Sequence, residues 1–356
     1  MKKAIRIVCI VLAAVILLAV CYAAYLFLAY HRIGDQPLAV QHAAPAGELQ
    51  PGTAYRILSY NIGFGAYESD YGFFMDGGTE SWAWSKERLD ANLKSIAGFL
   101  SEQNADLTIV QEVDFDATRT YHFDEREYLR SALSSQDSVF AQNFDSPFLC
   151  YPFTQPHGFA RAGLMSFSAF PMEDAAQRIE LPVENGAMKI LDLDRCYCKC
   201  RIPAGAGELV LYNFHLSAYT SDGSIATEQL KLLLEDMEKE YAAGSFCIAA
   251  GDFNKDLLGD SSVYFGKADK EYTWAQPFPS ELLDGVPVRL IAPLDEQAPV
   301  PSCRNADGPY HDGQFVLTID GFLVSDNVSV VSSEVIDTGF AWSDHNPVAM
   351  RFVLAP

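Results

Sequence analysis

The pattern of apolar and polar positions divides the chain into one long apolar run and a larger part with mixed periodicity. Between Arg6 and His31 lie 24 uncharged, mostly apolar residues, which as a helix rise about 36 Å at ~1.5 Å per residue. This length is sufficient to span a bilayer core of roughly 30 Å. Lys2, Lys3 and Arg6 precede the run, and only Arg32 follows it closely. The positive-inside rule therefore predicts a single-pass anchor with a cytoplasmic N-terminus and the rest of the chain outside the cell membrane.

A cleaved signal peptide is the alternative for this segment. Its apolar core is usually about 7–15 residues long and ends at a small-x-small site. The run here is longer and ends in mostly large residues from Tyr25 to Tyr30. We therefore assign residues 1–32 to a cytoplasmic stub and transmembrane signal-anchor. Residues 33–54 are rich in Pro, Ala, Gln and Gly without sustained periodicity, which predicts a tether.

Beyond residue 54, short strand-like runs alternate with stretches of helical periodicity. The strand-like runs cover 56–60, 107–111, 208–214, 246–250, 321–324 and 348–354. Large apolar residues recur at helical spacing within 89–100 and 230–241, which indicates two helices that each have one packing face. No clear linker or internal repeat interrupts this part. The sequence therefore predicts that residues 55–356 form one α/β domain.

The charge of the chain limits the classes of substrate. There are 25 basic and 47 acidic residues, a formal net charge of −22. Four of the basic residues flank the apolar run, and leaving them out gives 21 basic against 47 acidic residues, or −26. Proteins that bind nucleic acid normally present a basic surface to the phosphate backbone. Long DNA is therefore disfavoured as a substrate.

The eight cysteines are too few for a disulfide-rich scaffold of this length. Cys196, Cys198 and Cys200 alternate, so on a strand they would point to one face. We expect them to be small core residues or to contribute one disulfide. A metal site on the three thiols is the weaker alternative, because no Cys-x-x-Cys spacing accompanies them.

Polar residues of the kinds that bind metal ions and phosphate follow the predicted strands, where loops can bring them into one site. Six segments carry these residues: Tyr60-Asn61-Ile62, Gln111-Glu112-Val113, Asn213-Phe214-His215, Asp252-Phe253-Asn254, Ile319-Asp320-Gly321 and Ser343-Asp344-His345. Each segment alone has an ordinary structural explanation, such as a turn-forming Asn or a helix-capping Asp. Their occurrence together in this order is what predicts a site.

In type, order and spacing, the six segments resemble the signature of the endonuclease/exonuclease/phosphatase superfamily. That superfamily includes pancreatic deoxyribonuclease, the apurinic endonucleases, neutral sphingomyelinases and inositol-polyphosphate phosphatases. The resemblance covers the chain from about residue 55 to the C-terminus. It implies a four-layer α/β/β/α sandwich, in which two mixed sheets pack together and helices flank them. It also implies metal-dependent hydrolysis of a phosphoester.

The chemistry of phosphoester hydrolysis is consistent with these residue types. The reaction requires an in-line water, neutralisation of charge on the phosphoryl oxygens and stabilisation of the leaving alkoxide. A hard cation held by oxygen ligands suits the last two tasks. Glu112 is the best candidate for the principal Mg²⁺ ligand, and Asn61 and Asp344 complete the protein ligands, directly or through water. Mn²⁺ and Ca²⁺ are the alternative ions.

The resemblance implies roles for the other motif residues. Asp252 matches the residue that orients or deprotonates the attacking water, and Asn254 matches the one that holds this water or a phosphate oxygen. His345 matches a histidine that contacts the phosphate, and Asp320 matches the acid that fixes its tautomer and raises its pKa. His215 matches the general acid of the deoxyribonuclease and sphingomyelinase branches, whereas the apurinic endonucleases use a tyrosine-based arrangement.

Four further residues are candidates for binding the substrate phosphate. Asn213 would face the same side of its strand as His215 and could contact the phosphate. Arg119, Arg161 and Arg304 could bind it through their guanidinium groups. Ion pairing on the surface is the alternative explanation for each arginine.

Taken together, the sequence predicts a membrane-anchored, Mg²⁺-dependent phosphodiesterase or phosphatase that acts outside the cytoplasm. Its expected substrate is a lipid head group or a small phosphorylated molecule. An extracytoplasmic endo- or exonuclease is the first alternative, and an inactive binding module that keeps the fold is the second. All six segments retain chemically competent residues, which argues against the second alternative. No protein partner follows from the sequence.

Overall fold

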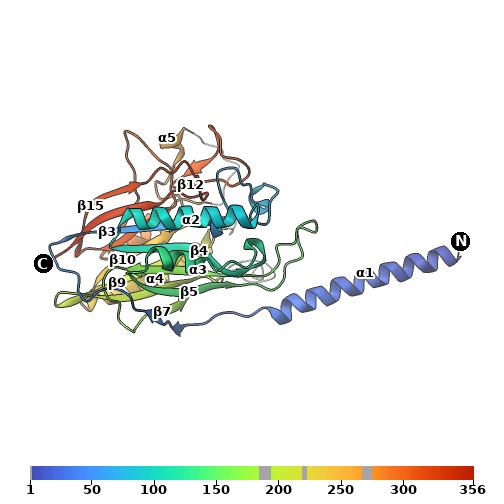
Figure 1. Cartoon of the computed structure of the whole chain (residues 1–356), viewed down its shortest axis with the longest axis horizontal. Helices are drawn as coiled ribbons and strands as arrows, with labels where there is room; N and C mark the ends of the chain where they lie inside the picture. The colour runs from blue at the N-terminus through green and yellow to red at the C-terminus, as the bar shows by residue number, and fades with distance from the viewer. Residues whose placement is uncertain (1, 184–193, 219–222, 267–274) are drawn as a thin grey trace.

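The computed structural model describes residues 2–183, 194–218, 223–266 and 275–356, and its body is a sandwich of two seven-stranded mixed sheets (Figure 1). The first sheet has the order β1 (Gln36–Pro37), β7 (Gln177–Glu180), β8 (Cys196–Ala204), β9 (Gly207–His215), β10 (Phe246–Asp252), β14 (Asp320–Ser325) and β11 (Val288–Ile291). The second has the order β15 (Val328–Val335), β16 (Val348–Leu354), β3 (Ala54–Asn61), β4 (Leu107–Ala117), β6 (Ala160–Ser168), β5 (Asp137–Asp145) and β2 (Val40–Gln41). A separate pair is formed by β12 (Cys303–Arg304) and β13 (Val316–Leu317).

Helices pack on the outer faces of the two sheets, and this arrangement confirms the predicted four-layer sandwich. On the second sheet, α2 (Lys86–Gln103) buries Ile96 and Leu100 in one cluster with residues of β3 and β4, and α3 (Glu125–Ala132) adds to this layer. On the first sheet, α4 (Ser224–Ala242) buries Leu230 and Leu234 in one cluster with residues of β9 and β10. A short helix, α5 (Ser262–Phe265), and the 3₁₀ turns η1 (Gly63–Gly65), η2 (Phe74–Asp76), η3 (Thr118–Thr120) and η5 (Ser280–Leu283) lie in the connections.

The largest core cluster lies between the sheets and takes side chains from both of them. Cys196, Cys198 and Cys200 of β8 are buried in it, and the sulfur atoms of Cys198 and Cys200 are 3.7 Å apart. All eight cysteines fall within the described residues, and each is free. The prediction that the alternating cysteines are core residues is therefore confirmed.

The segment predicted to be a tether packs against the domain instead, and here the structure corrects the sequence analysis. β1 pairs with β7 at one sheet edge, and β2 pairs with β5 at an edge of the other sheet. The N–H groups of Ala43 and Ala44 both donate to the carboxylate of Asp137, and Leu49 is fully buried. Such short edge strands need only free backbone groups on a neighbouring strand, so they leave no periodicity in the sequence.

The helix α1 (Lys2–Ala29) extends away from one end of the sandwich and has no buried residue (Figure 1). By length and composition it is the one helix of the described residues that could cross a membrane, and a signal sequence passes the same test. Its last turns contact the domain. The Tyr22 hydroxyl donates to the carbonyl of Phe148 and accepts from the N–H of Cys150, at 3.1 and 2.9 Å. The Tyr25 hydroxyl accepts from the N–H of Phe148 at 2.9 Å.

Candidate active site

The six predicted segments meet where the central strands of the two sheets end. In the first sheet, Asp252 at the end of β10 lies opposite His215 at the end of the parallel strand β9. The same residue lies opposite Asp320, the first residue of the antiparallel strand β14. In the second sheet, β3 ends at Asn61, which is paired with Gln111, the residue before Glu112. Strand pairing alone therefore brings carboxylate, amide and imidazole side chains to one edge of the sandwich.

Two residues of the site have left-handed backbone conformations, with φ values of 57° at Glu112 and 48° at Asn254. Such values are uncommon for residues other than glycine and concentrate at functional sites. The pairing of β4 with β6 shifts register between Val110 and Val113. This irregularity leaves the side chain of Glu112 partly exposed, whereas its neighbours Gln111 and Val113 are buried.

Asn61 joins the two sheets at the centre of the site. Its amide donates to Glu112 Oε1 and to Asp252 Oδ2, both at 3.1 Å, and lies 3.3 Å from His345 Nε2. Asp252 is held from the other side, because its Oδ1 accepts from the N–H of Asn254 at 2.8 Å. The side chain of Asn254 in turn donates to the carbonyl of Leu216 at 2.7 Å. These bonds fix the directions in which the two carboxylates point.

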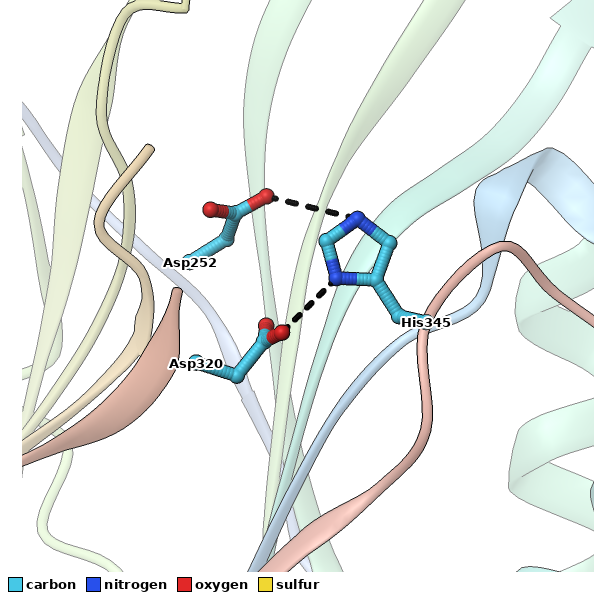
Figure 2. A group of neighbouring side chains, drawn as sticks. All are labelled: Asp252, Asp320 and His345. Atoms are coloured by element: carbon cyan, nitrogen blue, oxygen red, sulfur yellow. Dashed lines mark hydrogen bonds and ion pairs between the residues drawn. The ribbon is translucent and has the colours of Figure 1, made fainter. Parts of the chain in front are cut away.

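His345 lies between two carboxylates (Figure 2). Its Nδ1 donates to Asp320 Oδ2 at 2.8 Å, and its Nε2 lies 3.7 Å from Asp252 Oδ2. The hydroxyl of Ser302 donates to the same oxygen of Asp320 at 2.7 Å, which holds this acid in place. Burial lowers the pKa of His345, but the charges of Asp320 and Cys303 and their hydrogen bonds to the ring together outweigh burial, so the pKa lies well above the ordinary value. The arrangement therefore favours the protonated imidazole.

His215 has the opposite electrostatic environment. Its Nε2 lies 3.5 Å from Asp252 Oδ2 and 3.8 Å from Glu112 Oε1. Burial lowers its pKa well below the ordinary value, and the nearby charge of Arg195 lowers it further. The two histidines thus differ in their preferred charge although both face Asp252. Two titratable groups with well-separated pKa values can take different acid–base roles in one reaction.

The acidic side chains of the site fit a divalent cation. Burial and the charge of Asp344 together raise the pKa of Glu112 to about 8. Burial also raises the pKa of Asp252 to about 7. Oxygen donors that are buried together and repel one another are the ligands that Mg²⁺, Mn²⁺ or Ca²⁺ bind. A second grouping, formed by Asp252, Asp320 and His345, has ligand atoms within 4.8 Å of one another and could also hold a metal ion.

Most of the predicted site residues line a cavity of about 570 Å³, whereas Asn61 and Asp320 lie outside its lining. One part of its wall is polar and contains Glu112, His215, Asp252, Asn254, Asp344 and His345. Another part is apolar and contains Phe64, Tyr67, Phe73, Phe74, Met75, Phe144, Leu149 and Tyr151. Tyr22 and Leu26 of α1 belong to the lining as well. A cavity of this size, with a few convergent polar groups in an apolar wall, is typical of a binding site.

The structure places two of the predicted phosphate-binding residues in contacts within the protein. Arg119 lines the cavity, but its guanidinium donates to both oxygens of Asp114 at 2.9 Å and lies 3.3 Å from the centre of the Phe64 ring. Arg304 also lines the cavity and donates to the carbonyls of Glu68 and Gly308 at 2.9 and 3.0 Å. Both guanidinium groups are therefore engaged within the protein, Arg119 with strand β4 and Arg304 with loop carbonyls.

The other two predicted phosphate-binding residues lie outside the cavity lining. Arg161 pairs with Asp116 and Asp145 on the surface, at 3.4 and 3.3 Å. Asn213 is fully buried between the sheets, where its amide donates to the carbonyl of Met165 at 2.8 Å. Its side-chain oxygen accepts from Gln111 at 2.9 Å. The residue faces the same side as His215, as expected, but it lies two positions deeper in the strand and bridges the two sheets.

Arg195 is a cavity residue that the sequence analysis did not select. It is buried beside His215, and its Nη1 donates to the carbonyl of His215 at 3.4 Å. It precedes β8 and lies in none of the six segments. In the sequence, Arg195 stands out only as a charged residue directly before the strand of alternating cysteines. Such a position does not by itself indicate a site.

The contacts of Arg119 predict a structural role that can be measured. Arg119→Met should lower the free energy of unfolding by about 3 kcal/mol, because it leaves the buried carboxylate of Asp114 without its cationic partner. Arg161→Met is the matched control, and its exposed ion pairs should change stability by less than about 1 kcal/mol. Denaturant unfolding of the two variants measures this difference. A tenfold loss of kcat/KM in Arg161→Met with unchanged stability would instead support phosphate binding.

The comparisons with known proteins identify the family of the chain. Residues 58–345 match the Endonuclease/Exonuclease/phosphatase family, and the chain belongs to that family of phosphoester hydrolases. An endonuclease/exonuclease/phosphatase from Beutenbergia cavernae has a similar structure, with a TM-score of 0.59 at 18% identity over 85% of this chain and 72% of that one. ANGEL2, a 2′,3′-cyclic phosphatase, has a TM-score of 0.55 at 14% identity over 90% and 99% of the two chains. An endonuclease/exonuclease/phosphatase family protein from Leptotrichia buccalis has a TM-score of 0.53 at 14% identity over 84% and 99%. No curated protein matches the sequence.

Proposed function

We propose that the protein is a Mg²⁺-dependent phosphodiesterase or phosphatase that acts at the outer face of the cell membrane on the phosphoester of a lipid. The observation that carries this proposal is the hydrogen-bonded cluster in which Asn61 joins Glu112 to Asp252 and His345. The cluster supplies oxygen ligands, a candidate base and a cationic imidazole on one cavity wall. The long apolar helix α1 supports the location at a membrane.

Glu112, Asn61 and Asp344 are proposed to hold the metal ion. Glu112 and Asp344 line the same cavity, and the repulsion between them is a cost that a cation would remove. In the alternative grouping, His345 Nδ1 and Asp320 Oδ2 already bond each other. Metal ligation by these two atoms would therefore break the contact that orients His345. When bound, the ion would neutralise charge on the phosphoryl oxygens and stabilise the leaving alkoxide.

Asp252 and Asn254 are proposed to hold the attacking water. Asp252 Oδ1 accepts the N–H of Asn254, and Oδ2 accepts the amide of Asn61, so both carboxylate oxygens have fixed positions. A carboxylate held in this way can orient a water and accept its proton as the bond to phosphorus forms. Asp252 is the last residue of β10, which is paired with β9 and β14 up to that residue, and Asn254 follows two residues later.

The two histidines are proposed to act on the phosphate and on the leaving group. Asp320 holds Nδ1 of His345, so that Nε2 points toward Asp252 and the cavity, where a protonated ring can bind a phosphate oxygen (Figure 2). His215 lies across Asp252 from His345, and its neutral ring, with the proton on Nε2, can donate a hydrogen bond to the departing oxygen. Each histidine has one ring nitrogen near the reacting groups.

A lipid is favoured over nucleic acid by the charge of the domain. The part of the chain outside the membrane segment carries −26. The three arginines that could have bound a phosphate backbone make contacts within the protein at Asp114, at main-chain carbonyls and at Asp116. Without a cationic track, a polyanion would be repelled. The nuclease alternative therefore has no observation in its favour among the described residues.

The proposal is tested by a substrate panel on the full-length chain in detergent, with Mg²⁺ or with a chelator. The panel contains sphingomyelin, phosphoinositides, bis-p-nitrophenyl phosphate, and single- and double-stranded DNA. We expect turnover of a lipid or small phosphoester that is lost with the chelator and lost in Glu112→Ala. Hydrolysis of DNA alone, with a rate that falls steeply as salt rises, would support the nuclease instead. Absence of turnover on every substrate would contradict the proposal.

A further inference from the structure

The apolar part of the cavity is continuous with the outer end of α1. Tyr22 and Leu26, which lie one turn apart on that helix, line the same cavity as Asp252 and His345. The loop that follows β5 closes the contact, because the backbone at Phe148 and Cys150 bonds the hydroxyl groups of Tyr22 and Tyr25. The helix is therefore part of the wall of the active-site cavity as well as an anchor.

The length of the helix places this contact at or just inside the outer boundary of the hydrocarbon core. Arg6 and Tyr22 are separated by the 15 residues from Ile7 to Cys21. As a helix, these residues rise about 22 Å at ~1.5 Å per residue. The hydrocarbon core is roughly 30 Å thick. With Arg6 held near the inner boundary, Tyr22 can lie no farther out than the outer boundary. The loop bonded to Tyr22 must then lie at the same depth.

The side chains of this loop suit that environment. Phe148, Tyr151 and Phe153 are 41%, 61% and 81% exposed. Aromatic residues are enriched at the interface between hydrocarbon and water, and a cluster of exposed apolar side chains marks an interaction surface. Tyr151 also lines the cavity and packs edge-on against Phe74, which belongs to the apolar wall. An apolar path thus leads from the loop surface into the cavity.

We propose that the apolar part of the cavity is a lipid entrance, in which the hydrocarbon chain of a membrane lipid lies while its phosphoester reaches Asp252 and His345. The inference rests on the proposed function and adds that the chain itself is recognised, with Leu26 of the anchor and the 148–153 loop as part of the binding surface. The continuity of the cavity with α1 selects a bilayer lipid as the occupant. The cavity volume of about 570 Å³ is large enough for a head group and part of one chain.

Alkyl p-nitrophenyl phosphate diesters test the entrance without any assumption about the head group. Butyl, octyl and dodecyl esters share one reacting centre and differ only in chain length. With the full-length chain in detergent-stabilised bilayer discs, we expect kcat/KM to rise with chain length, by up to roughly fourfold for each methylene group that becomes fully buried. Leu26→Ser and Phe153→Ser should lower kcat/KM for the dodecyl ester at least tenfold, and by a clearly larger factor than for the butyl ester.

Val331→Ser is the matched control, because Val331 is also an exposed apolar residue, at 61%, and lies on the edge strand β15. It should leave both esters within twofold of wild type. The lipid entrance would be overturned if kcat/KM were equal for all chain lengths. It would also be overturned if Leu26→Ser and Phe153→Ser lowered kcat/KM equally for both esters. Neither result would contradict the proposed phosphoester hydrolase. Absence of Mg²⁺-dependent turnover on every ester, including butyl, would refute the proposed function itself.

Discussion

Asp252→Asn is expected to lower kcat by about 10⁴-fold, the upper range for loss of a general base. The carboxylate of Asp252 accepts hydrogen bonds from Asn61 and Asn254 and lies within 3.7 Å of Nε2 of both histidines. An amide has nearly the same shape but cannot accept a proton from the attacking water. The measurement is kcat on the best substrate of the panel.

The same substitution should not weaken the fold, which separates a catalytic role from a structural one. Burial raises the pKa of Asp252 to about 7, so the charged form is a cost to the folded state at higher pH. The neutral variant should therefore unfold at the same or a higher temperature than wild type at pH 8. Asp137→Asn is the matched control, because Asp137 is also buried but accepts N–H groups of Ala43, Ala44 and Met172 far from the site. It should lower stability and leave kcat within twofold.

A kcat of Asp252→Asn within tenfold of wild type would show that another group activates the water. Loss of kcat together with a lower melting temperature would assign Asp252 to the structure of the site. In either case the proposed role of this residue would be wrong, while the other motif residues would remain to be tested separately.

Asp320→Asn is expected to lower kcat by about 10³-fold, because it removes the anion that orients the imidazole of His345 and stabilises its protonated form. The pH profile gives a readout that a merely structural role would not change. The pKa of His345 lies well above the ordinary value in the wild type, so the protonated ring persists as pH rises. Removal of the Asp320 charge lowers that pKa, and the alkaline limb of the profile should move toward lower pH by at least about one unit.

Asp137→Asn also serves as the control here, since it should leave the alkaline limb unchanged. If the kcat of Asp320→Asn is lower at every pH while the alkaline limb keeps its wild-type position, His345 does not act as a cation. Unchanged kcat and an unchanged limb would remove both Asp320 and His345 from the proposed mechanism.

The site could be predicted from the sequence because each part of it is local. Asn61, Glu112, His215 and Asp252 lie at or just beyond strand ends, and strand ends can be recognised from short apolar runs. The pairing of the strands in the structure then brings these ends together at one edge, as the resemblance of the six segments implied. Asp320 follows the same rule as the first residue of its strand.

The roles of the arginines could not be predicted in this way. A guanidinium reaches far from its backbone, and its partner is chosen by the tertiary structure. Arg119 follows the Glu112 motif, yet its contact with Asp114 makes it part of the fold. Arg161 lies on β6 but points to surface carboxylates. Arg195 reaches the cavity from a segment that has no motif, because the pairing of β8 with β9 carries it to His215.

The sequence by itself determined the α/β class, the motif residues at the strand ends and the apolar helix, because strand alternation, motif spacing and hydrophobic length are properties of adjacent residues. The four-layer sandwich was implied by the family resemblance of the six motifs. Only the tertiary structure decided that residues 36–49 complete the sheets and that Tyr22 and Leu26 line the catalytic cavity. Both depend on contacts between segments more than 90 residues apart, such as His42 with Asp137 and Tyr22 with Phe148. Contacts of this kind leave no pattern in the local sequence, since almost any polar or apolar residue can make them once the fold has brought the segments together.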